Sequence, residues 1–305
     1  MKSVIAILVG TLALSSAASA QTRSVSHSLS PFNQISVSGE VGSSSFVVDI
    51  KQSVSYAIDL VIDELIAEYV QAIVKKDVLY LGVDTKAIPS EVKKLYKARN
   101  AAPCVLRATI YTPDMTALQV ADKSIVAVYD EFKTDSFAIS MKDKSSLKEL
   151  KINSKTVSVK LEDSANAAMT IAADDLDLNA SNKTVLNMNA DCVNLAVKLS
   201  NSAEFNVEGN YVDVKVESSN FSKAKFVGKG NSLVVNGSGN STVDAINLKV
   251  ASCETVLSNH SSLYEAASEN LKLDLTGSST VVFDGNPVIE IVKINSSTVT
   301  RYEAK

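Results

Sequence analysis

Residues 176–188 read LDLNASNKTVLNM, which is an alternating apolar run, a short polar run, and a second apolar run. The same order returns as VKLSNSAEFNV at residues 197–207, VKVESSNFSKAKF at 214–226 and LKLDLTGSSTVVF at 271–283. Such a repeat is typical of stacked coils, each of which buries its apolar side only against its neighbours. The sequence therefore predicts an all-β chain: a single-stranded, parallel β-helix-like solenoid.

Apolar anchors mark the period of this repeat. Most lie about 17 to 21 residues apart, with one double interval around Val250: Val157, Leu176, Val193, Val212, Leu233, Leu271 and Ile291. Successive side chains of a strand point to opposite faces. We therefore expect Val193, Leu195 and Val197 to point inward, and Asn194 and Asp177 to point toward solvent.

The polar runs between the strands have the composition of chain corners. Asn, Ser, Thr and Gly tolerate a positive φ or satisfy their own backbone, so residues such as Asn179, Ser181, Ser202 and Ser278 are expected at corners. Seven Asn-x-Ser/Thr sequons arise from the same composition, for example at Asn240 and Asn295. Turn chemistry explains these sequons without glycosylation.

The N-terminus has the order of a secretory signal. Residues 1–20 carry Lys2, an apolar stretch, and Ala18 and Ala20 before Gln21, which predicts cleavage after Ala20. We expect residues 21–30 to form a flexible leader. Without Lys2 the chain has 29 basic and 34 acidic residues, and this acidic balance argues against nucleic acid as a partner. No later segment is apolar enough to predict a transmembrane helix.

Residues 31–115 contain strands that are less regular than the repeat. GEVGSSS at residues 39–45 predicts a turn between two strands. Residues 56–73 fit both strand and helix spacing; we favour a strand, a helical turn near residues 63–68, and a hairpin of residues 70–74 and 78–83. Residues 85–102 predict a short solvated helix that starts at Pro89, with Ser90 as a possible cap.

Few side chains suggest chemistry. His27 lies in the leader and His260 in a polar corner, and neither has a partner at a catalytic or zinc-binding spacing. Cys104, Cys192 and Cys253 are expected to be free, buried thiols, because coils several turns apart are too distant for a disulfide. Asp174, Asp175 and Asp177, with Glu162 and Asp163 one coil earlier, form the best acidic group; we interpret it as solvated surface rather than as a Ca²⁺ or catalytic site.

Particular motifs resemble a known family. SPFNQISVSGEV at residues 30–41, YTPDMTAL at 111–118 with Pro113, and Gly285, Asn286 and Pro287 resemble the "head GIN" autotransporter adhesin family, a domain of unknown function in exported Bacteroidetes proteins. The resemblance covers residues 31–302, with N-terminal strands at 31–115 and repeat coils at 116–302. It implies a right-handed parallel β-helix outside the cytoplasm, and the insertion at residues 85–102 departs from its pattern.

Two classes of function follow from these observations. The first is a non-catalytic, adhesin-like protein of the cell envelope, periplasmic, outer-membrane-associated or extracellular, that binds a cell-surface or matrix glycan or protein. The alternative is a β-helical lyase or hydrolase acting on an acidic glycan, with the acidic group at Asp174, Asp175 and Asp177 as its catalytic group. The sequence lacks tryptophan, and its tyrosines are concentrated before Leu147. We therefore favour binding, and assign no catalytic, cofactor-binding or metal-binding residues.

Overall fold

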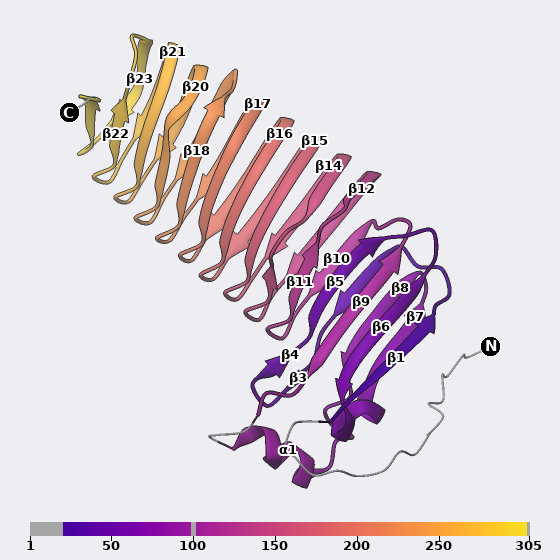
Figure 1. The fold of residues 1–305 in the computed structure, drawn as a ribbon. Helices are drawn as coiled ribbons and strands as arrows, with labels where there is room; N and C mark the ends of the chain where they lie inside the picture. The colour runs from indigo at the N-terminus through magenta and orange to yellow at the C-terminus, as the bar shows by residue number, and fades with distance from the viewer. Residues whose placement is uncertain (1–20, 99–101, 304–305) are drawn as a thin grey trace.

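The computed structural model describes residues 21–98 and 102–303, and they form a β-solenoid of about ten turns with one short α-helix. Figure 1 shows an elongated stack of strands in which the repeat coils follow one another from magenta to yellow. The predicted solenoid and the short helix are confirmed. The predicted signal peptide, residues 1–20, lies outside the described residues.

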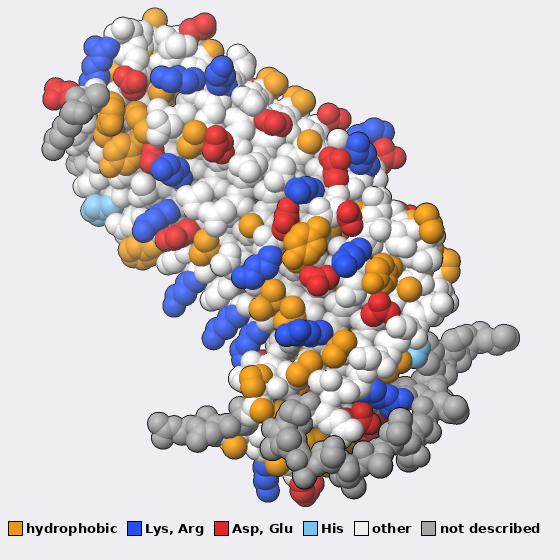
Figure 2. Space-filling model, in the orientation of Figure 1, with side chains coloured by type: hydrophobic (Ala, Val, Ile, Leu, Met, Phe, Trp, Pro, Cys, Tyr) orange, Lys and Arg blue, Asp and Glu red, His pale blue; other side chains and the backbone are white. Residues whose placement is uncertain are grey.

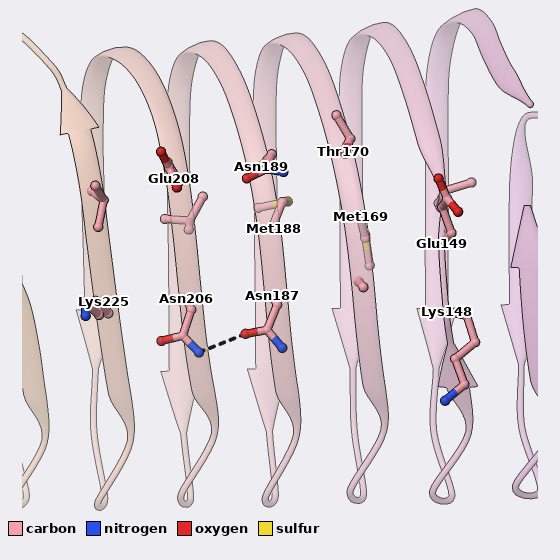
Figure 3. A pocket seen from close by; sticks show the side chains of 14 residues that line it. Lys148, Glu149, Met169, Thr170, Asn187, Met188, Asn189, Asn206, Glu208 and Lys225 are labelled. Carbon is pink, nitrogen blue, oxygen red and sulfur yellow. Dashed lines mark hydrogen bonds between the residues drawn. The ribbon is translucent and has the colours of Figure 1, made fainter. Parts of the chain in front are cut away.

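Each coil has two faces, joined by a tight turn at one edge and a wide bend at the other (Figures 1 and 3). Face A is the side that follows the tight turn, and face B is the side that follows the bend. Long strands run through the bend and contribute to both faces: β12 (Glu131–Met141), β14 (Lys151–Leu161), β15 (Asn166–Ser181), β16 (Val185–Ser200), β17 (Glu204–Ser218), β20 (Thr242–Leu257) and β21 (Ser262–Leu275).

Shorter strands complete each face. Face A also contains β1 (Thr22–Ser28), β6 (Ala57–Asp63), β9 (Leu106–Thr112), β5 (Val47–Gln52), β11 (Ile125–Val128), β13 (Ser146–Leu147), β18 (Lys223–Lys229), β22 (Thr280–Phe283) and β24 (Thr298–Arg301). Face B also contains β7 (Val70–Lys75), β8 (Val78–Val83), β2 (Gln34–Val37), β10 (Ala117–Val120), β19 (Ser232–Gly237) and β23 (Val288–Ile294). A small hairpin joins β3 (Glu40–Val41) to β4 (Ser44–Ser45), where the sequence predicted a turn.

The core lies between the two faces and is built from parallel apolar rows. In one row Val157, Leu176, Leu195 and Val214 are stacked by the register of β14 to β17, and all four are buried. Burial of one such side chain contributes roughly 1.5 to 3 kcal/mol, and it requires a coil on each side. Stability is therefore shared among neighbouring coils.

Two of the expected anchors were wrong by two residues. Val193 and Val212 are 43% and 44% exposed, whereas Leu195 and Val214 occupy the core row. At each bend two successive side chains face solvent, as at Asp174 and Asp175, so the alternation changes phase there. The terminal anchor Ile291 is also exposed, because no described coil packs beyond it.

The tight turns explain the polar runs. The turns that precede the last coil place two consecutive residues at positive φ, as at Asn182 (60°) and Lys183 (64°), and then bury a small residue, here Thr184. Asn tolerates the left-handed conformation, and a small hydroxyl or methyl fits the narrow interior. This order is itself the Asn-x-Ser/Thr pattern at Asn182, Asn220 and Asn259. Asn179, expected at a corner, lies instead on face B within β15.

The N-terminal region differs from the coils because part of its pairing is antiparallel. Residues 22–28 were expected in a flexible leader, and this was wrong: β1 pairs along its length with β6. Backbone hydrogen bonds to an open sheet edge order this strand although few of its side chains are apolar. The predicted hairpin is confirmed as β7 and β8, and the helical turn as the 3₁₀ helix η1 (Glu64–Tyr69).

Two helical segments complete this end of the molecule. η1 connects β6 on face A to β7 on face B and buries Ile66 and Ala67 against the core. The helix α1 (Ser90–Lys97) is solvated as predicted, although Val92 and Tyr96 pack partly on the core. Pro89 occupies the N-cap position, so the possible cap at Ser90 was wrong. Neither segment is long and apolar enough to span a membrane, nor is any other helix among the described residues.

Candidate binding groove

A shallow groove crosses face A along the axis of the solenoid (Figure 3). Its volume is about 500 Å³, and its lining comes from five successive coils, from Lys148 beside β13 to Lys225 on β18. The outward positions that form it are Lys148, Ala168, Thr170, Asn187, Asn189, Asn206, Glu208 and Lys225.

The hollow has a local cause in side-chain size. Ala168 and Thr170 are small, whereas the coils on either side carry longer lysine and asparagine side chains at neighbouring positions. Met169 and Met188 point inward and contribute apolar edges to the floor, because each is only 4–5% exposed. The groove therefore combines polar walls with a partly apolar floor.

An asparagine pair spans the middle of the groove. Asn206 Nδ2 donates to Asn187 Oδ1 at 3.0 Å across neighbouring coils. In Figure 3 the amide oxygen of Asn206 and the amide nitrogen of Asn187 point away from this bond in opposite directions along the groove. The pair therefore presents an acceptor toward the coil of Lys225 and a donor toward the coil of Ala168, the residue that pairs with Asn187.

Charged side chains lie on the two long sides of the groove. Lys148 and Lys225 lie nearer the tight turns, and Glu149 and Glu208 nearer the bend (Figure 3). Glu149 also forms an ion pair with Lys151 at 2.9 Å. These groups are exposed, so salt weakens their attraction for a charged ligand.

The acidic group expected from the sequence is divided by the fold. Asp163 lies at a tight turn, where it accepts a hydrogen bond from Asn182 Nδ2 at 3.1 Å. Asp175 lies at the bend and accepts one from Asn194 Nδ2 at 2.7 Å, and Asp177 is exposed on face B. Within residues 21–98 and 102–303, no group of three or more His, Cys, Asp or Glu side chains is placed to hold a metal ion.

Histidine and cysteine occupy structural positions. His260 is the second residue of a tight turn, with φ of 63°, as the polar corner predicted. The expectation of free, buried thiols is confirmed for Cys104, Cys192 and Cys253. Burial raises the pKa of Cys104 and of Cys192 to about 12, so both thiols stay protonated at neutral pH and react weakly.

Sequence reasoning missed one buried carboxyl, Glu265 of β21. Its side chain is fully buried; Oε2 accepts from the Ala267 N–H at 2.7 Å, and Oε1 has no hydrogen-bond partner among the described residues. Burial, with a smaller contribution from Asp284, raises the pKa of Glu265 to about 7. The alternation from Leu263 would have found this inward position.

These features define a class of protein: an elongated β-solenoid whose polar face carries an open, extended groove. The chain belongs to the family described as "Putative auto-transporter adhesin, head GIN domain", whose model matches residues 31–192 and 169–287. The sequence resemblance to this family is thereby confirmed. No curated protein matches the sequence.

Solved structures of similar chains come from Parabacteroides and Bacteroides species. One, from Parabacteroides distasonis and described as a "Putative lipid binding protein", has 14% identity and a TM-score of 0.49, with coverage of 92% of this chain and 97% of that one. A "putative adhesin" from Parabacteroides merdae has 14% identity and a TM-score of 0.47, with coverage of 93% and 97%. A "putative adhesin" from Bacteroides fragilis has 16% identity and a TM-score of 0.35, with coverage of 93% and 98%.

Proposed function

We propose that this chain is an exported, non-catalytic binding protein of the cell envelope that holds an extended glycan in the groove on face A. The observation that carries this proposal is the groove itself, which crosses five coils and is lined by amide and charged side chains. Membership of a family described by an adhesin domain, together with the signal-like residues 1–20, supports a role outside the cytoplasm.

The lining favours a glycan over an extended peptide. Strands β13 to β18 are paired on both sides at the groove, so a peptide finds no open sheet edge there to extend. Asparagine amides one coil apart, at a spacing of about 4.8 Å, and the lysine ammonium groups of Lys148 and Lys225 at the two ends of the groove can instead bond to the hydroxyl or carboxylate groups of a sugar chain. None of the described residues that line the groove is aromatic, so affinity must come from many weak contacts.

The positions of the carboxylates support binding rather than hydrolysis. Glu149 and Glu208 are three coils apart, which corresponds to about 14 Å at the coil spacing. Glycosidases hold their two carboxyl groups roughly 5 to 9.5 Å apart across the scissile bond. The alternative enzyme would use the acidic group of Asp174, Asp175 and Asp177, and in this group Asp175 accepts a hydrogen bond from Asn194.

A glycan and matrix-protein array with the purified protein tests this proposal. The double variant Asn187→Ala and Asn206→Ala should lower the affinity for a bound glycan at least tenfold. Asn194→Ala is the matched control, because it removes one amide hydrogen bond between coils at the bend, outside the groove. Equal loss in both variants, or binding only to proteins, would contradict a glycan site in the groove.

A second measurement separates binding from catalysis. The protein is incubated with a panel of acidic and neutral polysaccharides, and the products are followed by chromatography. We expect unchanged substrate. Cleavage that is lost in an Asp175→Ala variant would overturn the non-catalytic function and support the lyase or hydrolase.

A further inference from the structure

The C-terminal coil exposes the surface that every earlier coil buries. Strand β23 has the sequence VIEIVKI, and all seven of its residues are exposed. Val288, Ile291 and Val292 are 72%, 59% and 55% exposed, and Ile289 and Ile294 are each 40% exposed. Figure 2 shows hydrophobic side chains gathered at this end of the molecule.

The exposed isoleucines continue the core rows. Ile289, Ile291 and Ile294 are stacked on Leu271, Leu273 and Leu275, each of which is fully buried. Among the described strands, β23 pairs with β21 alone, so its other edge presents unpaired backbone groups. A row of apolar side chains beside an open strand edge is the surface on which another strand adds.

The sequence of β23 is complementary to itself in the antiparallel direction. When Glu290 of one copy is placed opposite Lys293 of another, Ile289 falls opposite Ile294 and Ile291 opposite Val292. A two-fold axis through the strand then creates two such Glu–Lys pairs, because an isologous contact occurs twice.

A bulge makes this register possible. Residues three apart on a regular strand point to opposite faces, yet the pairing with β21 shifts register between Leu273 and Asp274. Glu290 is thereby placed beside Lys272, and Lys293 beside Asp274, on the outward side, while Ile289 and Ile294 both face the core rows. In this one register, opposite charges therefore face each other on the outward side, and apolar side chains face each other on the core side.

We propose that two copies of this chain associate end to end through their C-terminal coils, with β23 paired antiparallel to β23 of the second copy. Both faces then continue across the junction, and the core rows of the two solenoids meet. The two face A grooves lie on the same side of the dimer. A polymer or surface that carries repeated sites can engage both grooves, and this raises the apparent affinity without a new contact.

Sedimentation equilibrium of the purified full chain tests the association, and charge reversal tests its register. The wild-type protein should reach twice the monomer mass with increasing concentration. Glu290→Lys alone and Lys293→Glu alone should each lower the association constant at least tenfold, because each places like charges opposite one another twice. An equimolar mixture of the two variants should restore association, since every contact between them again joins a lysine to a glutamate.

A matched control uses the preceding coils. Glu204→Lys reverses one member of the Glu204–Lys223 ion pair, 3.7 Å long, between β17 and β18, neither of which pairs with β23, and should leave the association constant unchanged. Unchanged melting temperatures of all variants at a concentration where the wild type is monomeric would show that the chain still folds. A wild type that stays monomeric overturns the proposal, as does a dimer that is insensitive to both β23 variants or a mixture that does not associate.

Discussion

The two ends of the solenoid differ in whether the apolar core is covered. At the N-terminal end, η1 crosses between the faces and buries Ile66 fully against the core. At the C-terminal end, Ile291 occupies a core row and is 59% exposed. A stack of coils buries its apolar rows only where something covers them. The closed end therefore stabilises the single chain, whereas the open end is available for association.

The largest effect is expected in the middle of the stack, where both neighbours are present. Leu195→Asp places an unpaired carboxylate in the core row and should cost several kcal/mol. Asn194→Asp should cost about 0.5 to 1 kcal/mol, because its new carboxylate lies opposite Asp175 on the neighbouring strand. Urea unfolding of the two variants measures this difference. Equal losses would show that we have assigned the faces incorrectly.

Shortening one isoleucine side chain at each end of the solenoid tests the comparison directly. Ile66→Ala should lower the free energy of unfolding by about 2 to 5 kcal/mol, the usual cost of a cavity in a packed core. Ile291→Ala should lower it by less than about 1 kcal/mol when measured on the monomer, because most of that side chain already contacts solvent. A loss at Ile291 as large as that at Ile66 would mean that the C-terminal coil is covered in solution.

Ionisation of Glu265 should loosen the open end. Its pKa is about 7 in the folded chain and about 4.5 when unfolded, so the unfolded state ionises first as pH rises. The unfavourable contribution of Glu265 to stability should therefore be absent below pH 4.5 and grow to about 3 kcal/mol between pH 4.5 and 7. The Glu265→Gln variant should lack this contribution.

Urea unfolding at pH 5 and pH 8 measures the difference between wild type and Glu265→Gln. Hydrogen exchange, corrected for its intrinsic pH dependence, should show faster opening of β21 to β24 above pH 7, with η1 and β6 unchanged. Loosening that is equal at both ends would indicate a global effect rather than one local to the open end.

The smallest effect is expected at the tight turns between the two ends. Asn201 donates to Asn182 and accepts from Asn220, each at 3.2 Å, and has φ of 53°. Asn201→Gly keeps the left-handed conformation and should cost about 0.5 kcal/mol for the lost amide bonds. Asn201→Ala should cost about 1 kcal/mol or more, since alanine is disfavoured at positive φ. Thermal unfolding of the two variants separates the contribution of the asparagine hydrogen bonds from that of the left-handed backbone conformation.

The repeat allowed much of the solenoid to be predicted, and the errors concentrate where its regularity is interrupted. Leu195 and Val197 were placed correctly, but Val193 was not, because the bend adds an outward residue that alternation does not reveal. The order of β1 was missed because backbone pairing with β6 provides it. The groove was also missed: it depends on the small side chains of Ala168 and Thr170 lying beside longer ones from other coils.

The sequence by itself determined that this chain is a solenoid, since alternating strands and turn-forming residues are local properties repeated along it. The scattered cysteine positions also predicted correctly that the thiols are free. Tertiary structure decided which side chains share a row, which end of the core is covered, and that the carboxyl group of Glu265 is buried. These properties depend on the register between coils, because neighbours in space are about one period apart in the chain and one shifted residue exchanges the two faces.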